Sequence, residues 1–261
     1  MLTLDQVYPV SNSRLTAFKK SPKHLIHYLT EPKEQTPAMA FGVAFHAYLL
    51  EPVPFMSRFA IAPNVDRRTK EGKLEYDKFV YEAEDKTIIS QSDYNKIQEM
   101  TDAIRSNTIA GELISNLIKT ELDCRWINED TGIEMRGIID GIGIDYIIDI
   151  KTCQDAHPMK FGRDAVNMNY HRQAAIYLDS HPERKNYDYY LIAIERDAPY
   201  GCSVNQITEE AINSGRKQYI DMLIEYHTWI ENGMPESGYE YWHYNGVFEL
   251  NLPTWKKLEE L

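Results

Sequence analysis

The predicted order of helices and strands indicates an α/β fold, with a mixed central sheet flanked by helices and preceded by a helical N-terminal part. Three observations support this prediction. Amphipathic helical patterns come first, three short apolar strands follow one another in the middle, and a helix, two strands and a long helix come last. Consecutive strands joined by tight turns pair as antiparallel neighbours, whereas an intervening helix allows two strands to run parallel. We therefore expect both strand directions in one sheet.

Apolar periodicity in the first part of the chain predicts helices at 11–30, 38–51, 73–84 and 91–118. The second of these begins after Pro37, and the last places Ile97, Met100 and Ile104 on one apolar face. Residues 52–72 contain three prolines and are predicted to be mostly loop.

Apolar, β-branched segments in the second part predict strands at 121–128, 133–140, 144–151, 188–195 and 201–207. Residues 130–132 supply the first turn and Gly141–Gly143 the second. A helix at 160–179 separates the two groups of strands, and a helix at 209–231 follows them, with Thr208 as its N-cap.

Residues 137–152, with the sequence GIIDGIGIDYIIDIKT, place two acids and a lysine inside strands that are otherwise apolar. An unpaired buried charge costs on the order of several kcal/mol, so this group predicts a cation-binding site. Residues i and i+2 of a strand share a face, so Asp149 and Lys151 are expected to face one cavity while Ile150 faces the core. Asp140, on the preceding strand, is expected to lie opposite Asp149.

The carboxylates of Asp140 and Asp149 and the backbone carbonyl of Ile150 are the oxygen ligands that Mg²⁺ or Mn²⁺ prefers. Such a metal activates water and stabilises charge on a phosphate during in-line displacement. Lys151 would orient or deprotonate that water, or neutralise charge at phosphorus. The same residues also fit a buried aspartate–lysine ion pair, because this spacing on a strand is a loose pattern.

Two helical patterns add polar groups to this site. Gln173 and Tyr177 are four residues apart and share one helix face, where they can hydrogen-bond water, phosphate and the DNA backbone. His46 lies in a Gly-x-x-x-His segment that ends in Leu-Leu-Glu-Pro. Taken alone, each pattern is more typical of an ordinary amphipathic helix.

Taken together, Asp140, Asp149-Ile150-Lys151 and Gln173-x-x-x-Tyr177 resemble the PD-(D/E)xK nuclease superfamily. The resemblance is strongest to RecB/RecE-like exonucleases of the exonuclease VIII type, which also carry an upstream helix histidine that matches His46. Ile139 stands where the family has a proline, and Asp149 stands where glutamate is commoner. Neither difference removes a ligand.

The ends of the chain extend the resemblance over most of residues 10–255. Ser11–Pro22 is similar to the start of these domains, and Pro235–Trp242 and Leu252–Trp255 are similar to their ends. The resemblance implies a restriction-endonuclease-like core. It also implies one nuclease domain over residues 1–261, with its parts at 1–118 (helical, with the site histidine), 119–235 (catalytic core) and 236–261 (C-terminal extension).

In function, the resemblance implies a Mg²⁺-dependent exodeoxyribonuclease, with Mn²⁺ as a substitute, that degrades double-stranded DNA ends 5′→3′ in recombination or repair. Asp140 and Asp149 would hold the metals and His46 would complete or support their site. Lys151 would position or activate water, and Gln173 and Tyr177 would orient the phosphate and the strand. The family, often phage-encoded, also implies a ring-shaped homo-oligomer and a single-strand annealing protein as partner.

Two further candidates have alternatives of equal weight. Glu121 begins a predicted strand where family members often carry a glutamate near the site, and it also fits an exposed strand-end acid. Arg136 alternates with Ile138 and Asp140 on one strand face, so it either contacts DNA phosphate or pairs with an acid.

The net charge of −12, from 40 acids and 28 bases, is unusual for a DNA-binding protein, which needs cations on phosphates. Either the basic residues gather around one channel, or the protein does not act on nucleic acid. A short polar stretch contains Arg67, Arg68, Lys70 and Lys73. It favours the first alternative, as a mobile arm over DNA, and fits a solvated loop equally well.

The remaining composition narrows the class of protein. No apolar run is long enough to span a membrane, and the N-terminus lacks the order of a signal peptide. The three cysteines have no spacing for disulfides, zinc or an iron–sulfur cluster, so we expect a cytoplasmic protein. The resemblance implies that the cell is a bacterium or a phage-infected host. A structure- or sequence-specific endonuclease, or a non-catalytic DNA-binding or assembly protein, remains an alternative.

Overall fold

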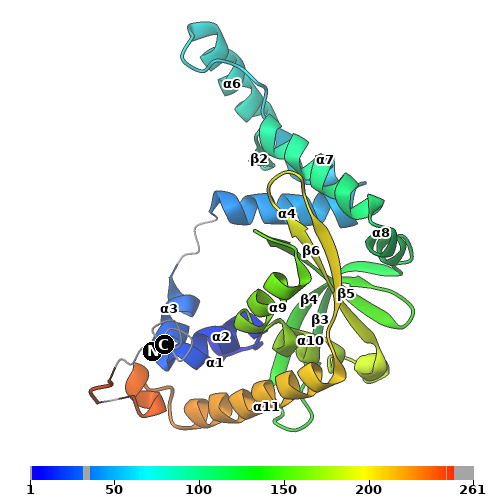
Figure 1. The fold of residues 1–261 in the computed structure, drawn as a ribbon. Helices are drawn as coiled ribbons and strands as arrows, with labels where there is room; N and C mark the ends of the chain where they lie inside the picture. The colour runs from blue at the N-terminus through cyan, green and yellow to red at the C-terminus, as the bar shows by residue number, and fades with distance from the viewer. Residues whose placement is uncertain (1, 32–35, 245, 250–261) are drawn as a thin grey trace, which may run out of the picture.

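The structure, a computed structural model, describes residues 2–31, 36–244 and 246–249. Its centre is a five-stranded sheet in the order β3-β4-β5-β6-β7 (Figure 1). β3 (Lys119–Ile127), β4 (Glu134–Ile142) and β5 (Tyr146–Cys153) form an antiparallel meander, β6 (Asp188–Glu195) runs parallel to β5, and β7 (Cys202–Gln206) runs antiparallel to β6. The predicted α/β class with a mixed sheet flanked by helices is confirmed.

Each face of the sheet has its own apolar core, because neighbouring strand residues point to opposite faces. Tyr189 and Leu191 of β6 belong to the first core, and Ile192 and Ile194 belong to the second. The first core includes α1 (Leu4–Val7), α2 (Asn12–Lys20), α3 (Pro22–Thr30), α9 (Pro158–Asn167), α10 (Tyr170–Leu178) and α11 (Glu209–Glu231). The second includes α4 (Pro37–Leu50), α5 (Phe55–Arg58), α7 (Gln91–Ser106) and α8 (Thr108–Ser115).

Three predicted helices, at 11–30, 91–118 and 160–179, are each two helices in the structure. Ser21 is extended before Pro22, where proline disfavours helical backbone, and its side chain caps α3. Asn107 is also extended, and its side chain accepts a hydrogen bond from the Ala110 backbone N–H to cap α8. Asn169 takes the left-handed conformation (φ 57°) between α9 and α10. Single capping residues therefore divide continuous apolar patterns.

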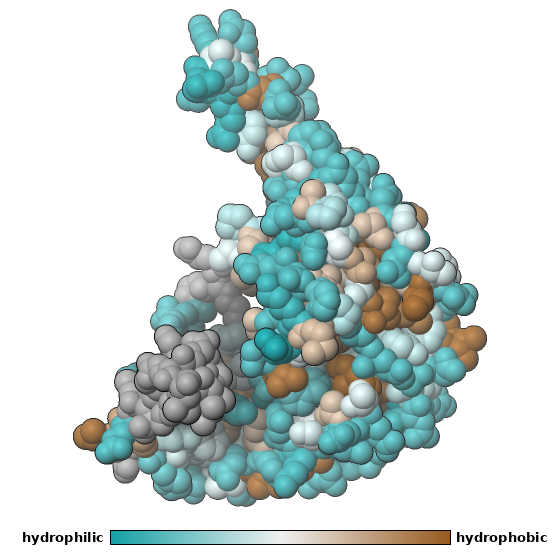
Figure 2. Space-filling model, in the orientation of Figure 1, coloured by the Kyte–Doolittle hydropathy of each residue, from teal (hydrophilic) through white to brown (hydrophobic). Residues whose placement is uncertain are grey.

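The predicted loop at 52–72 contains α5 and β1 (Phe59–Ile61), and α6 (Lys70–Ala83) begins earlier than expected. β1 pairs in parallel with β2 (Thr87–Ile89), and α6 connects the two strands. In Figure 1, α6 projects from the body as an arm, and its surface in Figure 2 is mainly hydrophilic. Strands this short have too little periodicity to be predicted.

The β4–β5 hairpin turns later than predicted. Gly141 is still paired in β4, opposite Ile148, and the chain turns over residues 143–145. A Cβ on Gly141 would lie 2.8 Å from Leu117 Cδ1, so glycine serves close packing there rather than the turn.

Within the described residues, no helix is both long and apolar enough to cross a membrane. The η2 3₁₀ helix (Tyr239–Trp242) lies in the predicted C-terminal extension, and residues 250–261 of that extension, with the Leu252–Trp255 similarity, lie outside the described residues.

Candidate active site

The charged residues of the central motif gather where β4 and β5 separate. The two strands pair only at Gly141↔Ile148 and Ile142↔Ile147. The pairing ends before Asp140 and Asp149, so their predicted position opposite each other stays a prediction. Farther along β4, Val10 forms a bridge with Met135. The site residues of β4 and β5 therefore lie just beyond the paired part of the hairpin.

Asp140 and Asp149 are both buried, with 8 % and 2 % of their surfaces exposed. The backbone N–H of Ile150 donates a 2.7 Å hydrogen bond to Asp140 Oδ2. Ile150 itself packs in the second core, as the strand alternation predicts. The backbone therefore fixes the Asp140 carboxylate beside β5.

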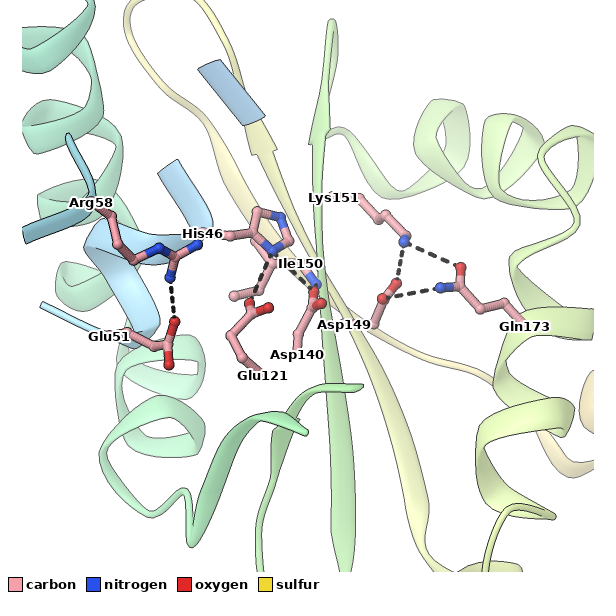
Figure 3. A network of polar contacts seen from close by, with 9 residues as sticks. All are labelled: His46, Glu51, Arg58, Glu121, Asp140, Asp149, Ile150, Lys151 and Gln173. Carbon is pink, nitrogen blue, oxygen red and sulfur yellow. Dashed lines mark hydrogen bonds and ion pairs between the residues drawn. The ribbon is translucent and has the colours of Figure 1, made fainter. Parts of the chain in front are cut away.

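His46, Glu121 and Asp140 form the first group of polar side chains (Figure 3). His46 Nδ1 lies 3.5 Å from Asp140 Oδ2 and 3.8 Å from Glu121 Oε1. One ligand atom from each residue lies within 4.8 Å of the others. This acid–histidine group joins α4, β3 and β4, so the structure brings together two predicted site residues and the weaker candidate Glu121.

Glu121 has an unusual backbone conformation for a strand residue. The β3–β4 pairing on either side places it opposite Asp140, and its φ is +47°, in the left-handed region. Non-glycine residues rarely adopt that region, and such strain is frequently found at functional sites. The strain accompanies an acidic side chain that faces His46.

The acid–histidine group carries a proton at neutral pH. Burial by itself lowers the pKa of His46, but the Asp140 and Glu121 carboxylates raise it to about 10. Burial likewise raises the pKa of Asp140, but His46 and Lys151 outweigh burial and hold that pKa below its usual range. A protonated imidazole therefore balances the carboxylates, and a metal bound through its Nδ1 would displace that proton.

The second group contains Asp149, Lys151, Gln173 and Tyr177. Lys151 Nζ lies 2.6 Å from Asp149 Oδ2 and donates to Gln173 Oε1 at 3.2 Å. Gln173 Nε2 donates to Tyr177 Oη at 3.1 Å and, at 3.5 Å, to Asp149 Oδ1. The predicted Gln-x-x-x-Tyr pair therefore meets the predicted Asp-x-Lys pair in one network.

Electrostatics keeps this lysine charged. Burial lowers the pKa of Lys151, but Asp149 and Asp140 raise it above its usual range. Burial raises the pKa of Asp149, although the Lys151 ammonium opposes that shift. The lysine is therefore a fixed cation and hydrogen-bond donor at neutral pH.

Two residues outside the predicted set, Gly137 and Tyr170, contact this network, and a third, Arg172, precedes Gln173 in α10. A Cβ on Gly137 would lie 2.5 Å from Tyr177 Cε1, so the tyrosine ring packs on a bare strand backbone. Lys151 Nζ lies 4.7 Å from the centre of the Tyr170 ring, within cation–π range. Arg172 is fully buried and donates to side chains of α2. Of these three residues, only Gly137 could have been identified from the sequence, because a glycine inside a strand often marks a close approach of another group.

The side chains present fit a divalent cation. Glu121 Oε1 and Asp149 Oδ2 are buried and accept no hydrogen bond within the described structure, although Asp149 Oδ2 has Lys151 as an ion-pair partner. Carboxylates are suitable ligands for Mg²⁺ or Mn²⁺, and the imidazole adds a nitrogen ligand of the kind that transition metals accept. In the acid–histidine group, Glu121 joins the predicted ligands His46 and Asp140. Asp149 is not part of that group and pairs with Lys151 instead. Asp149 and the Ile150 carbonyl therefore stay predicted ligands.

Two hollows open on opposite sides of the site. The first, the basic groove, has a volume of about 1380 Å³ and runs along α2 and α3 to Lys151, Gln173 and Tyr177. Its cationic and histidine lining consists of Arg14, Lys20, His24, His27, Arg136 and Lys151, against a single acid, Glu31, in the described lining. The second, the His46 pocket, has a volume of about 230 Å³ and is lined by Gly42, Val43, His46, Ala47, Glu51, Arg58 and Glu121.

The predicted DNA-binding cations divide between two places. Arg136 lines the basic groove and donates to both carboxylate oxygens of Asp123, at 2.9 and 2.8 Å. The other four lie at the start of the α6 arm, which Figure 1 shows projecting away from the sheet. Of these, Arg68 bonds Asp66 at 3.0 Å, and Arg67 lies 4.0 Å from the centre of the Tyr76 ring. A DNA contact by Arg67, Arg68, Lys70 or Lys73 stays a prediction.

Comparisons with known proteins agree with this geometry. The family model of a PDDEXK-like domain of unknown function (DUF3799) matches residues 11–240. The crystal structure of a protein from Eubacterium rectale, named "Putative exonuclease", has a TM-score of 0.59 with 12 % sequence identity. The match covers 100 % of this chain and 99 % of that chain. At that identity the likeness shows the fold alone.

No protein with a curated description matches the sequence significantly. The predicted membership of the PD-(D/E)xK superfamily is confirmed, whereas the narrower RecE-like type stays a prediction. The separated strands, the buried acids and the Asp-x-Lys pair occur together in a chain whose matched residues span nearly its whole described length. The chain belongs to the PDDEXK-like family DUF3799.

Proposed function

We propose that the protein is a metal-dependent exodeoxyribonuclease that degrades double-stranded DNA ends 5′→3′ in recombination or repair. One observation carries the proposal: three carboxylates and a histidine lie beside a lysine held by Asp149 and Gln173, at the end of the basic groove. Such a combination suits hydrolysis of a phosphodiester. The polarity and the preference for ends come from the resemblance of the motifs.

In this proposal, His46, Glu121, Asp140 and Asp149 hold a divalent cation, most suitably Mg²⁺, with Mn²⁺ as a substitute. The cation supplies Lewis acidity and a more acidic water. Lys151, held by Asp149 and Gln173, donates hydrogen bonds to phosphate oxygens or positions the attacking water.

Gln173 and Tyr177 position the lysine and the substrate. Gln173 accepts from Lys151 and donates to Tyr177, so one amide fixes both the ammonium and the phenol. Tyr170 covers the lysine from another side. A side chain held by several partners is pre-organised, which lowers the cost of reaching the transition state.

The basic groove supports a polyanionic substrate despite the net charge of −12. Its lining gathers Arg14, Lys20, Arg136 and Lys151 with two histidines beside the reacting groups. Phosphate neutralisation by clustered cations drives nucleic-acid binding even when the rest of the surface is acidic. A ring-shaped homo-oligomer and a single-strand annealing partner also belong to this proposal.

The test compares linear 5′-labelled double-stranded DNA with closed circular DNA, each with Mg²⁺, with Mn²⁺ and with EDTA. Metal-dependent loss of the linear DNA alone, with early release of the label as mononucleotide, is the expected result. Cutting of the circle would instead indicate an endonuclease. Binding without cleavage in either metal would indicate a non-catalytic protein.

A further inference from the structure

The His46 pocket lies across the acid–histidine group from Lys151. In Figure 3, Arg58 and Glu51 stand on one side of that group, and Lys151 and Gln173 stand on the other. The pocket shares His46 and Glu121 with the group, whereas the basic groove reaches Lys151. A strand that leaves the basic groove over the acids would therefore meet the His46 pocket next.

Arg58 lines this pocket and has N–H donors left for a ligand. One of its terminal nitrogens lies 2.7 Å from Glu51 Oε2, and 45 % of its side-chain surface is exposed. Glu51 is its one acceptor within the described structure. A guanidinium has five N–H donors, so most of them remain available for a second anion.

The position of Arg58 is fixed by buried aromatic packing. Phe55, in the same short helix α5, is 2 % exposed and stacks on Phe59 at 4.8 Å between ring centres. Phe55 also packs edge-on against Tyr48 of α4, at 5.1 Å. The guanidinium carbon itself lies 5.6 Å from the centre of the Phe59 ring. The arginine is therefore anchored to the helix that carries His46.

We propose that Arg58 is a further substrate-binding residue, which binds a backbone phosphate of the nucleic acid on the side of the site opposite the basic groove. The inference rests on the proposed nuclease function. The other charged groups of the pocket lining include two carboxylates, Glu51 and Glu121, which repel phosphate. A guanidinium matches phosphate geometry through paired hydrogen bonds, and here it offers the compensating charge.

A purely structural ion pair between Arg58 and Glu51 makes a different prediction. In that case, removing either partner has the same consequence, because each variant loses the same contact. If Arg58 binds phosphate, loss of the arginine weakens binding. Loss of the Glu51 charge then leaves binding unchanged or strengthens it, because a competing anion is gone.

The experiment measures binding of a fluorescein-labelled DNA duplex with a single-stranded overhang, over a range of salt concentrations. The full-length protein carries Lys151→Ala throughout, so that binding is measured apart from cleavage. Arg58→Ala should raise Kd about tenfold at low salt and reduce the slope of log K against log salt by about 1. Arg58→Lys should restore part of the affinity, and Glu51→Gln should retain it. Arg105→Ala, which removes an exposed arginine that lines neither hollow, is the matched control.

Equal affinity of the Arg58→Ala and Arg105→Ala proteins would overturn the inference while the nuclease proposal stands. So would equal weakening by Arg58→Ala and Glu51→Gln. Failure of the parent Lys151→Ala protein to bind the duplex at any salt concentration would overturn the proposed function, and this inference with it. Thermal unfolding of each variant confirms that the compared proteins are folded.

Discussion

The acid–histidine group and the Asp149–Lys151–Gln173–Tyr177 network lie side by side but are built in different ways. The first joins His46 of α4 to Glu121 and Asp140 of two neighbouring strands, and it relies on a proton on His46 to balance its carboxylates. The second joins β5 to α10, and its one acid already has the Lys151 ammonium at 2.6 Å. One region has excess negative charge, and the other is neutral and preassembled.

This difference assigns the two regions different work. A region with excess negative charge and a carboxylate oxygen, Glu121 Oε1, that accepts no hydrogen bond is suited to bind a cation, because the cation balances the charge. A neutral, hydrogen-bonded region is suited to hold a charged donor in one orientation. Four predictions test this division, from the largest expected effect to the smallest.

Lys151→Ala should reduce cleavage by on the order of a thousandfold, because it removes a fixed cation from the developing charge of the transition state. DNA binding and folding should persist, since several other cations line the basic groove. Single-turnover cleavage of linear DNA and duplex binding are the two measurements. Lys160→Ala, a surface lysine paired with Asp155, is the control. Near-normal cleavage by Lys151→Ala would refute the role of the lysine.

Asp140→Asn and Asp149→Asn should each weaken Mn²⁺ binding, measured by calorimetry without DNA. We expect Asp140→Asn to weaken it at least about a hundredfold, because it removes a ligand and the acid that His46 contacts. A smaller loss is expected for Asp149→Asn, because Lys151 already competes for that carboxylate. Unchanged Mn²⁺ affinity of Asp149→Asn would limit the ligands to the acid–histidine group.

The sequence predicted the second region better than the first, for a physical reason. Asp149 and Lys151 share a face through the strand period, and Gln173 and Tyr177 share one through the helix period, so each pair is set locally. The approach of Glu121 to His46 depends on sheet pairing, on a left-handed residue and on the packing of α4 against the sheet. Local patterns do not contain this information.

In the fold, too, local sequence patterns predict some features and not others. The order of the large elements was predictable, because long periodic segments carry a strong signal. The breaks at Ser21, Asn107 and Asn169 depend on capping or backbone conformation at single residues inside apolar patterns. The position of Arg58 depends on an aromatic cluster drawn from α4, α5 and β1, which no local period encodes.

Gln173→Ala should lower the cleavage rate about tenfold while Mn²⁺ affinity stays unchanged. The variant removes the acceptor of Lys151 and the donor to Tyr177, so the ammonium loses orientation but not charge. Single-turnover rates and calorimetry on the same preparation give both quantities. A loss of Mn²⁺ affinity equal to that of Asp149→Asn would show that the two regions act as one unit.

Gly137→Ala should destabilise the protein by about 1–3 kcal/mol, because the new methyl group would overlap the Tyr177 ring. Gly162→Ala is the matched control: it lies in α9 with nothing within 4 Å of the added Cβ, and alanine favours a helix interior by about 1 kcal/mol. Urea unfolding measures both changes. Displacement of Tyr177 should also slow cleavage by the Gly137→Ala protein, because the Tyr177 hydroxyl accepts a hydrogen bond from the Gln173 side chain. Equal stability of the two variants would mean that β4 or the ring moves freely, and that the second region is less rigid than its hydrogen bonds indicate.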